Sequence, residues 1–242
     1  MTLLVSGLLL GTSTVLADNR DPLEPVNRVI FSINNGVDRV LVRPVARTYH
    51  WVIPDPMEQG VRNVFANLGE VRNASNNLLQ GKWRRTGAAT GRFAINTTVG
   101  LVGVFDVASR MGIEPVPEDF GQTLGYWGLG HGFYLVLPIL GPSSLRDGTG
   151  RVVDQWQNPL NYVEMEHWQR GSILVVDGLQ TRADLLASDG LFSGDTYPVI
   201  REAYFSMREF QVNDGEVKSD AFIDEDSAEE GFVDEGFIDE SF

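Results

Sequence analysis

Three histidines, a glycine-rich stretch and scattered carboxylates are the residues of this 242-residue chain that could do chemistry. His50, His131 and His167 lie far apart, and no H-E-x-x-H or other local metal-ligand spacing surrounds them. No G-x-S-x-G nucleophile motif occurs, and the absence of cysteine removes disulfides, thiolate metal sites and a cysteine nucleophile. His131 has no recognisable nucleophile or orienting acid beside it, so we interpret it as a loop or interface histidine. The sequence thus predicts no enzyme, no metal site and no cofactor.

The glycine-rich stretch GYWGLGHGFYLVLP, at 125–138, is the most unusual segment. A dinucleotide-binding fingerprint needs glycines at i, i+2 and i+5, but the third position is Phe133 counted from Gly128 and Leu135 counted from Gly130. No P-loop motif occurs elsewhere. The spacing therefore argues against a nucleotide site and leaves two interpretations, a buried strand or a backbone that bends next to lipid.

The net charge of -14 is concentrated at the C-terminus. From Asp214 to the end there are 12 acidic residues and one basic residue, Lys218, so this part carries -11 and the rest of the chain -3. The body has no basic patch for nucleic acid. Residues 213–242 are predicted to be a disordered acidic tail, either solvated or a docking peptide with spaced phenylalanines.

The N-terminus is typical of an export signal, with an apolar run followed by small residues. Residues 1–17 are the predicted signal peptide, cleaved before Asp18. The run is shorter than the roughly 20 apolar residues that a spanning helix needs. A lipoprotein signal requires a cysteine at the cleavage point, and the sequence has none, so a lipidated anchor is not expected.

Helical periodicity dominates the rest of the chain, and the fold class is predicted to be all-α. Capping boxes at Asp21–Glu24 and Asp55–Glu58 are predicted to start two amphipathic helices. Pro44 is expected to disturb or end the first, and Gly81 to stop the second. Four further helical segments are expected, at 84–110, 146–157, 164–187 and 197–211, with Ser144 and Asp147 available as a cap.

Asparagine is frequent on the first two predicted helices, although it is a mediocre helix former. The positions are 27, 34, 35, 63, 67, 73, 76 and 77. Two interpretations remain open: ordinary surface helices, or helices whose uncharged polar face lines a passage or lies at a bilayer boundary.

Several motifs together resemble the MlaA family, also called VacJ, from about residue 21 to residue 210. They are DPLEPVNRVIF, VRPVA, NLLQGK, RFAINTTVGLVGVFDVA, FGQTLGYWGLGHGFYLVLPILGPSSLRD, TRADLLASDGLF and IREAYF, in the family's order. The first motif contributes the family residues Asp21, Pro22, Glu24, Asn27 and Arg28.

The resemblance implies that residues 18–212 form a ring-like helical domain in the inner leaflet of the Gram-negative outer membrane. It further implies retrograde phospholipid transport that maintains lipid asymmetry, through an amphipathic channel beside a glycine-rich hairpin. A trimeric porin and a soluble periplasmic lipid carrier are the implied partners, with phospholipid as the cargo. The residues implied at the channel and hairpin are Gly125, Gly128, Gly130, Gly132, Phe133, Tyr134, Leu135 and Leu137.

A second class remains as the alternative, a scaffold that binds porin without carrying lipid. A Gly130→Val substitution is expected to abolish lipid clearance but spare porin binding if the channel interpretation holds. A lipid-hydrolysing enzyme is disfavoured because no nucleophile and base are recognisable together.

Overall fold

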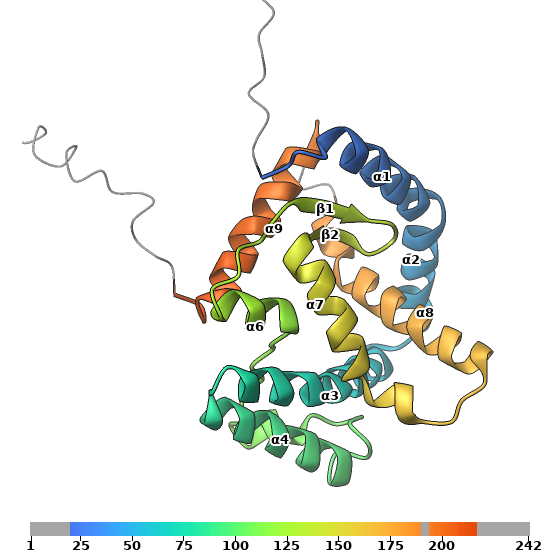
Figure 1. The fold of residues 1–242 in the computed structure, drawn as a ribbon. Helices are drawn as coiled ribbons and strands as arrows, with labels where there is room; N and C mark the ends of the chain where they lie inside the picture. Colours follow the sequence, from blue (N-terminus) through green and yellow to red (C-terminus); the bar gives the residue numbers. More distant parts are fainter. Residues whose placement is uncertain (1–19, 190–193, 217–242) are drawn as a thin grey trace, which may run out of the picture.

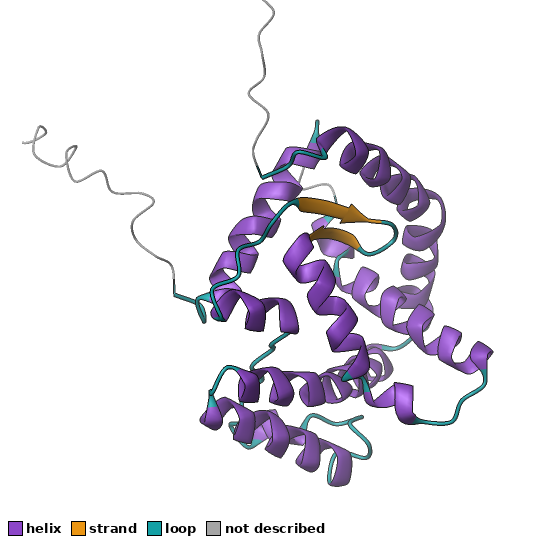
Figure 2. Cartoon of the chain, viewed as in Figure 1, coloured by secondary structure: helices purple, strands orange, loops and turns teal. Residues whose placement is uncertain are grey.

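The computed structural model describes residues 20–189 and 194–216. Within these ranges the chain is mostly helical with a single two-stranded hairpin (Figures 1 and 2). The predicted helical fold is confirmed, and a small two-stranded hairpin lies at the end of the glycine-rich stretch, where the resemblance implied one. The predicted signal peptide and the predicted tail beyond residue 216 lie outside the described residues.

The elements follow one another with short connections. In order they are α1 (Glu24–Val37), the π-helical turn η1 (Asp38–Val42), α2 (Arg43–Val52), α3 (Asp55–Leu79), α4 (Trp83–Thr98), α5 (Val107–Arg110), α6 (Phe120–Tyr126), β1 (Tyr134–Leu137), β2 (Gly141–Ser144), α7 (Leu145–Trp156), the 3-10 turn η2 (Pro159–Tyr162), α8 (His167–Asp184), the 3-10 turn η3 (Leu186–Ser188) and α9 (Thr196–Val212).

The helices surround α7 and the hairpin (Figure 1). α1, η1 and α2 form one curved arm that α8 packs against, while α3 pairs with α4 on another side. Pro44 does not end this arm, because the helix passes through the π turn just before it and continues as α2. The three C-terminal segments match the sequence prediction within three residues at each end.

The hydrogen bonds at the first turns of the helices show which predicted caps are present. Ser144 caps α7 as predicted, since its Oγ accepts a hydrogen bond of 3.1 Å from the Asp147 amide. The two Asp-Pro capping boxes are wrong, because neither α1 nor α3 has a side-chain cap. The Asp21 carboxylate is buried and accepts instead from Tyr197 at 2.6 Å and from Asn27 at 2.8 Å. Long-range partners therefore hold the acid that local spacing assigns to the helix end.

The apolar and polar faces of the arm are reversed relative to an ordinary soluble helix. On α1, Val26, Val29 and Ile33 are 54 to 60% exposed, whereas Asn27 is buried. Among the described residues, buried polar and charged side chains outnumber buried hydrophobic ones. A monomeric protein in water rarely exposes this much contiguous apolar surface. No helix in the described ranges combines the length and hydropathy needed to cross a bilayer.

A small aromatic core joins the hairpin to α9. Tyr134 and Tyr197 are almost fully buried, and their rings meet edge to face with centroids 6.1 Å apart. Phe205 packs on Tyr134 at 5.6 Å, and Phe31 of α1 meets Tyr197 at 5.4 Å. Aromatic pairs of this kind add about 0.5–1.5 kcal/mol each beyond the burial of area. These contacts fix the position of β1 between α1 and α9.

Candidate functional site

A cleft of about 1020 Å³ lies between α3, the hairpin, α7 and α8. This volume is at the upper end of ordinary ligand sites, which range over roughly 300–1,000 Å³. Its apolar lining consists of Phe65, Leu68, Leu135, Leu137, Leu140, Leu145, Val152, Trp156, Leu160, Ile173 and Leu174. Its charged lining consists of Arg72, Arg151, Asp154 and Asp177. The same cleft therefore offers a long apolar wall and a set of ionic groups.

A smaller apolar pocket of about 480 Å³ adjoins the cleft and shares Trp156 with it. It is formed between α3, α4 and η2, with Val71, Phe93 and Tyr162 in its wall. Trp156, which ends α7, thus has apolar space on two sides and is 69% exposed.

Strand alternation separates the predicted hairpin residues. Leu135 and Leu137 line the cleft, whereas Tyr134 points to the other face of β1 and is fully buried in the aromatic core. Phe133 precedes the strand, is 51% exposed and is not among the lining residues. Only the two leucines of this predicted apolar wall therefore face the cleft.

The four glycines predicted at the channel and hairpin differ in whether their positions require glycine. Gly128 and Gly132 adopt φ values of 90° and 67°, which favour glycine. A Cβ on Gly125, in α6, would lie 2.7 Å from a Val212 methyl group. A Cβ on Gly130 would meet nothing within 4 Å, so the structure gives the expected effect of Gly130→Val no steric basis. None of the four lines the cleft.

The family motif of α1 holds the hairpin in place. Asn27 Nδ2 donates to the Tyr134 carbonyl at 3.0 Å, and Asn27 Oδ1 accepts from the Val136 amide at 2.9 Å. Asn34, two turns later, bonds the Leu137 carbonyl and the Ile139 amide in the same way, both at 2.9 Å. These two asparagines therefore satisfy backbone hydrogen-bonding groups of the hairpin and are not among the residues that line the cleft.

The other motif residues surround this contact. Pro22 lies in the turn that precedes α1. Arg28 pairs with Glu24 at 2.7 Å and with Asp195 at 2.8 Å, and it stacks over Tyr197. The motif thus ties α1 to the start of α9.

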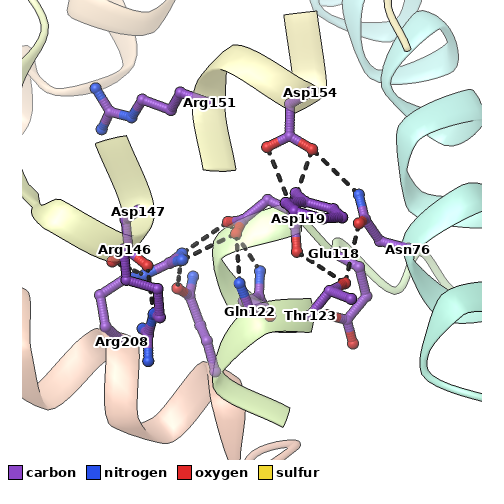
Figure 3. A network of polar contacts seen from close by, with 12 residues as sticks. Asn76, Glu118, Asp119, Gln122, Thr123, Arg146, Asp147, Arg151, Asp154 and Arg208 are labelled. Carbon is purple, nitrogen blue, oxygen red and sulfur yellow. Dashed lines mark hydrogen bonds and ion pairs between the residues drawn. The ribbon is translucent and has the colours of Figure 1, made fainter. Parts of the chain in front are cut away.

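A charge network of Asp119, Arg146, Asp147 and Arg208 joins α6, α7 and α9 (Figure 3). Arg208 bonds Asp119 through two nitrogens at 2.7 and 2.9 Å and Asp147 through a third at 2.8 Å. Burial favours the neutral acid, but the bonds from Arg208, Tyr204 and Arg146 outweigh it and hold the pKa of Asp147 well below its ordinary value. The pKa of Asp119 is lowered for the same reason, again against burial.

The ionic groups of the cleft are less fully partnered, and two of them, Arg151 and Asp177, are exposed. The Arg72 side chain makes no hydrogen bond or ion pair within the described residues, and its Nε is buried. Burial raises the pKa of Asp177, and nearby Arg72 offsets only part of this rise. Asp154 differs, because it accepts from the Phe120 amide at 3.0 Å and from Asn76 at 3.2 Å (Figure 3).

His131, interpreted from the sequence as a loop or interface histidine, lies against the aromatic core. The His131 ring packs edge to face on Phe205 at 5.5 Å. Burial and then the nearby Arg146 lower the pKa of His131, which favours its neutral form. No group of three His, Asp or Glu residues in the described part of the chain could hold a metal ion.

Sequence reasoning missed Arg72, Arg151 and Asp177. A signal was present for Asp177, which is the single charge in the apolar run ILVVDGL. For Arg72 and Arg151 the sequence holds no comparable signal, since each is one of two arginines on its helix.

Outward apolar faces, a polar interior and an amphipathic cleft define a membrane-associated helical protein. The chain belongs to the MlaA lipoprotein family, whose profile matches residues 19–211. It is 35% identical to the intermembrane phospholipid transport system lipoprotein MlaA of Escherichia coli (strain K12), over 90% of this chain and 92% of that protein. The corresponding protein of Haemophilus influenzae is 33% identical, over 84% of this chain and 83% of its own length.

A solved structure supports the same assignment. It comes from work on the structural basis for maintenance of bacterial outer membrane lipid asymmetry, and it superposes with a TM-score of 0.72 at 38% identity. The match covers 80% of this chain and 99% of that one.

Proposed function

We propose that this protein transports phospholipids at the outer membrane and so maintains its lipid asymmetry, with the cleft between α3, the hairpin, α7 and α8 as the passage. The observation that carries the proposal is the mixed lining of this cleft, in a chain of the MlaA lipoprotein family. The relatives named for intermembrane phospholipid transport match nearly the whole chain. The protein is accordingly a transport protein and not an enzyme.

The chemistry of the passage is physical and involves no covalent step. A phospholipid has a charged head and apolar tails, and the cleft provides ionic groups together with a leucine-rich wall. A charge at the centre of a bilayer costs about 2.5–3.5 kcal/mol or more. A head group that travels among the charged residues of the cleft avoids most of this cost while its tails remain against Leu135 and Leu137.

The location and partners follow from the same proposal. The exposed apolar face of α1, η1 and α2 is suited to the acyl chains of the inner leaflet of the outer membrane. A trimeric porin is the proposed partner that holds the protein in place, with the helices forming a ring-like wall around the passage. A soluble periplasmic carrier would receive the lipid, and removal of lipid by this carrier would give the transport its retrograde direction.

Filling the cleft tests the proposal. Gly69 lines it from α3, and the nearest atom to an added Cβ is Arg72 Nη2 at 4.0 Å. Gly69→Phe should therefore introduce a ring into the cleft without a backbone clash. Gly87→Phe is the matched control, because Gly87 is also inside a helix, has nothing within 4 Å of its Cβ and does not line the cleft.

The measurement is the amount of phospholipid exposed on the surface of intact cells that lack the gene. The unaltered chain and Gly87→Phe should both restore the low level, and Gly69→Phe should not, although all three accumulate equally. If Gly69→Phe restores it fully, the cleft is not the passage. If deletion leaves surface phospholipid unchanged while porin complexes are lost, the scaffold alternative is correct.

A further inference from the structure

The ionic groups of the cleft fall into two kinds. Asp154 is used by the fold, because it accepts from the Phe120 amide and from Asn76. Arg72 has a buried Nε without a hydrogen-bond partner, and the exposed Asp177 is influenced by the charge of Arg72 without a hydrogen bond from it. Arg151 donates from a single nitrogen to the Pro142 carbonyl at 3.3 Å, so most of its donors remain available.

The unpartnered Nε of Arg72 costs stability because it is buried, whereas Asp177 and Arg151 are exposed and keep water as a partner until a ligand enters the cleft. Isolated charged groups that lose water without gaining partners are unfavourable, and proteins pair them almost everywhere. On α3 itself, Glu70 is bonded by Arg92 at 2.5 Å and by Asn73 at 3.0 Å. Arg72, two residues later on the same helix, has no such partner within the described ranges. A partner supplied from outside the chain accounts for this contrast.

We propose that the cleft recognises a zwitterionic head group, with Arg72 and Arg151 binding the phosphodiester and Asp177 binding a primary ammonium. This inference rests on the proposed function and names the class of lipid that the cleft prefers. Guanidinium groups match the geometry of phosphate oxygens, and a carboxylate is the natural partner of an ammonium. The two cations come from α3 and α7 and the anion from α8, so the head group would bridge three helices.

Charge complementarity distinguishes the zwitterion from an anionic lipid. Both head groups carry the phosphodiester that the arginines bind. A head group without a cation leaves Asp177 unpaired, whereas an ammonium neutralises it. The preference should therefore depend on Asp177, and the overall affinity should depend on Arg72.

The test measures which lipids the purified full-length protein binds. The protein is incubated with vesicles of phosphatidylethanolamine and phosphatidylglycerol in equal amounts, recovered, and its bound lipids are quantified by mass spectrometry. The unaltered chain should be enriched in phosphatidylethanolamine by about tenfold, the worth of one charge-assisted hydrogen bond. Asp177→Asn should bring the ratio close to one with little change in total lipid, and Arg72→Gln should reduce both lipids together.

Matched controls are available outside the cleft. Glu164→Gln and Arg84→Gln remove one charge of each sign from exposed residues that have no ion pair within the described ranges. Both should behave as the unaltered chain. Thermal melting of each variant should give a transition like that of the unaltered chain if the fold is retained.

The outcomes separate the two proposals. If lipid is captured, Gly69→Phe reduces it, and Asp177→Asn leaves the phosphatidylethanolamine preference intact, the head-group assignment is wrong and the passage stands. The head-group assignment is equally wrong if the unaltered chain shows no preference. If lipid capture is absent, or is unaffected by Gly69→Phe, the proposed passage itself is wrong.

Discussion

The charge network of α6, α7 and α9 and the charges of the cleft use the same residue types for opposite purposes. In the network, Arg208 is bonded to both Asp119 and Asp147 through three of its nitrogens. In the cleft, Arg72 and Asp177 are near enough for Arg72 to influence the pKa of Asp177 but do not pair. Satisfied charges hold helices together, and unsatisfied charges are available to a ligand.

The acids of the two regions also have pKa values that are shifted in opposite directions. Burial alone would raise the pKa of the network acids, but hydrogen bonds outweigh it and hold both values below the ordinary one. In the cleft, burial dominates and raises the pKa of Asp177. The pKa of Asp154 is raised by burial and then by the charge of Asp119. Measurements of folding stability as a function of pH can therefore distinguish the contributions of the two regions.

The largest expected effect comes from breaking the network. Arg208→Met would leave Asp119 and Asp147 as buried acids without their main cation, which typically costs about 3–5 kcal/mol. The free energy of unfolding in urea should fall by this amount. Arg84→Met removes an arginine of similar size from the surface and should change it by less than about 0.5 kcal/mol. Equal effects of the two substitutions would show that the network is not what stabilises these helices.

A smaller loss of folding stability is expected when the pH is lowered. Burial alone would raise the pKa of Asp106, but hydrogen bonds from Ser109, Asn96 and Arg92 outweigh it and lower the pKa from 3.8 to about 2. A lowered folded-state pKa gives stability that is present above the unfolded value and lost as pH falls through the folded value. The free energy of unfolding should therefore decline between about pH 4 and pH 2.

Variants assign this decline to its source. Asp106→Asn should make the acid limb of the stability curve shallower, since asparagine does not titrate. Asp177→Asn should not make that limb shallower, because the raised pKa of Asp177 gives a contribution of the opposite sign, which increases stability as the pH falls. An acid limb that is insensitive to Asp106→Asn would contradict the assignment.

The smallest expected effect on stability comes from substituting Asp177 in the cleft. The ionised Asp177 is disfavoured by burial in the folded state, so its removal should not destabilise the protein. Asp177→Asn should melt at the same temperature as the unaltered chain or slightly above it at neutral pH. A clear loss of thermal stability would mean that Asp177 has a structural partner and belongs with the network.

Local patterns predicted local structure well. The start of α7 was predictable because Ser144 and Asp147 are three residues apart, and the helix that follows was confirmed within one residue. The capping role of Asp21 was wrong because its partner Tyr197 lies 176 residues away. Burial decided that outcome, and burial of this kind is not visible in a short window of sequence.

The cleft was only partly predictable for the same reason. Leu135 and Leu137, which line the cleft, were named in advance because the family resemblance places the glycine-rich stretch in a hairpin beside the channel. Arg72 and Asp177 come from helices about 100 residues apart, and only their missing partners set them apart. A missing partner becomes visible only after the chain has been folded.

The two asparagines of α1 have one further consequence, for the edge of the hairpin that has no third strand beside it. An unpaired strand edge is a template for joining another chain, and β1 has β2 on one side only. Asn27 and Asn34 cover the outer edge of β1 and the adjoining turn with side-chain amides, and the Arg20 carbonyl accepts from the Tyr134 amide at 2.8 Å. The hairpin is thus shielded against edge-to-edge aggregation by its own helix, without a third strand.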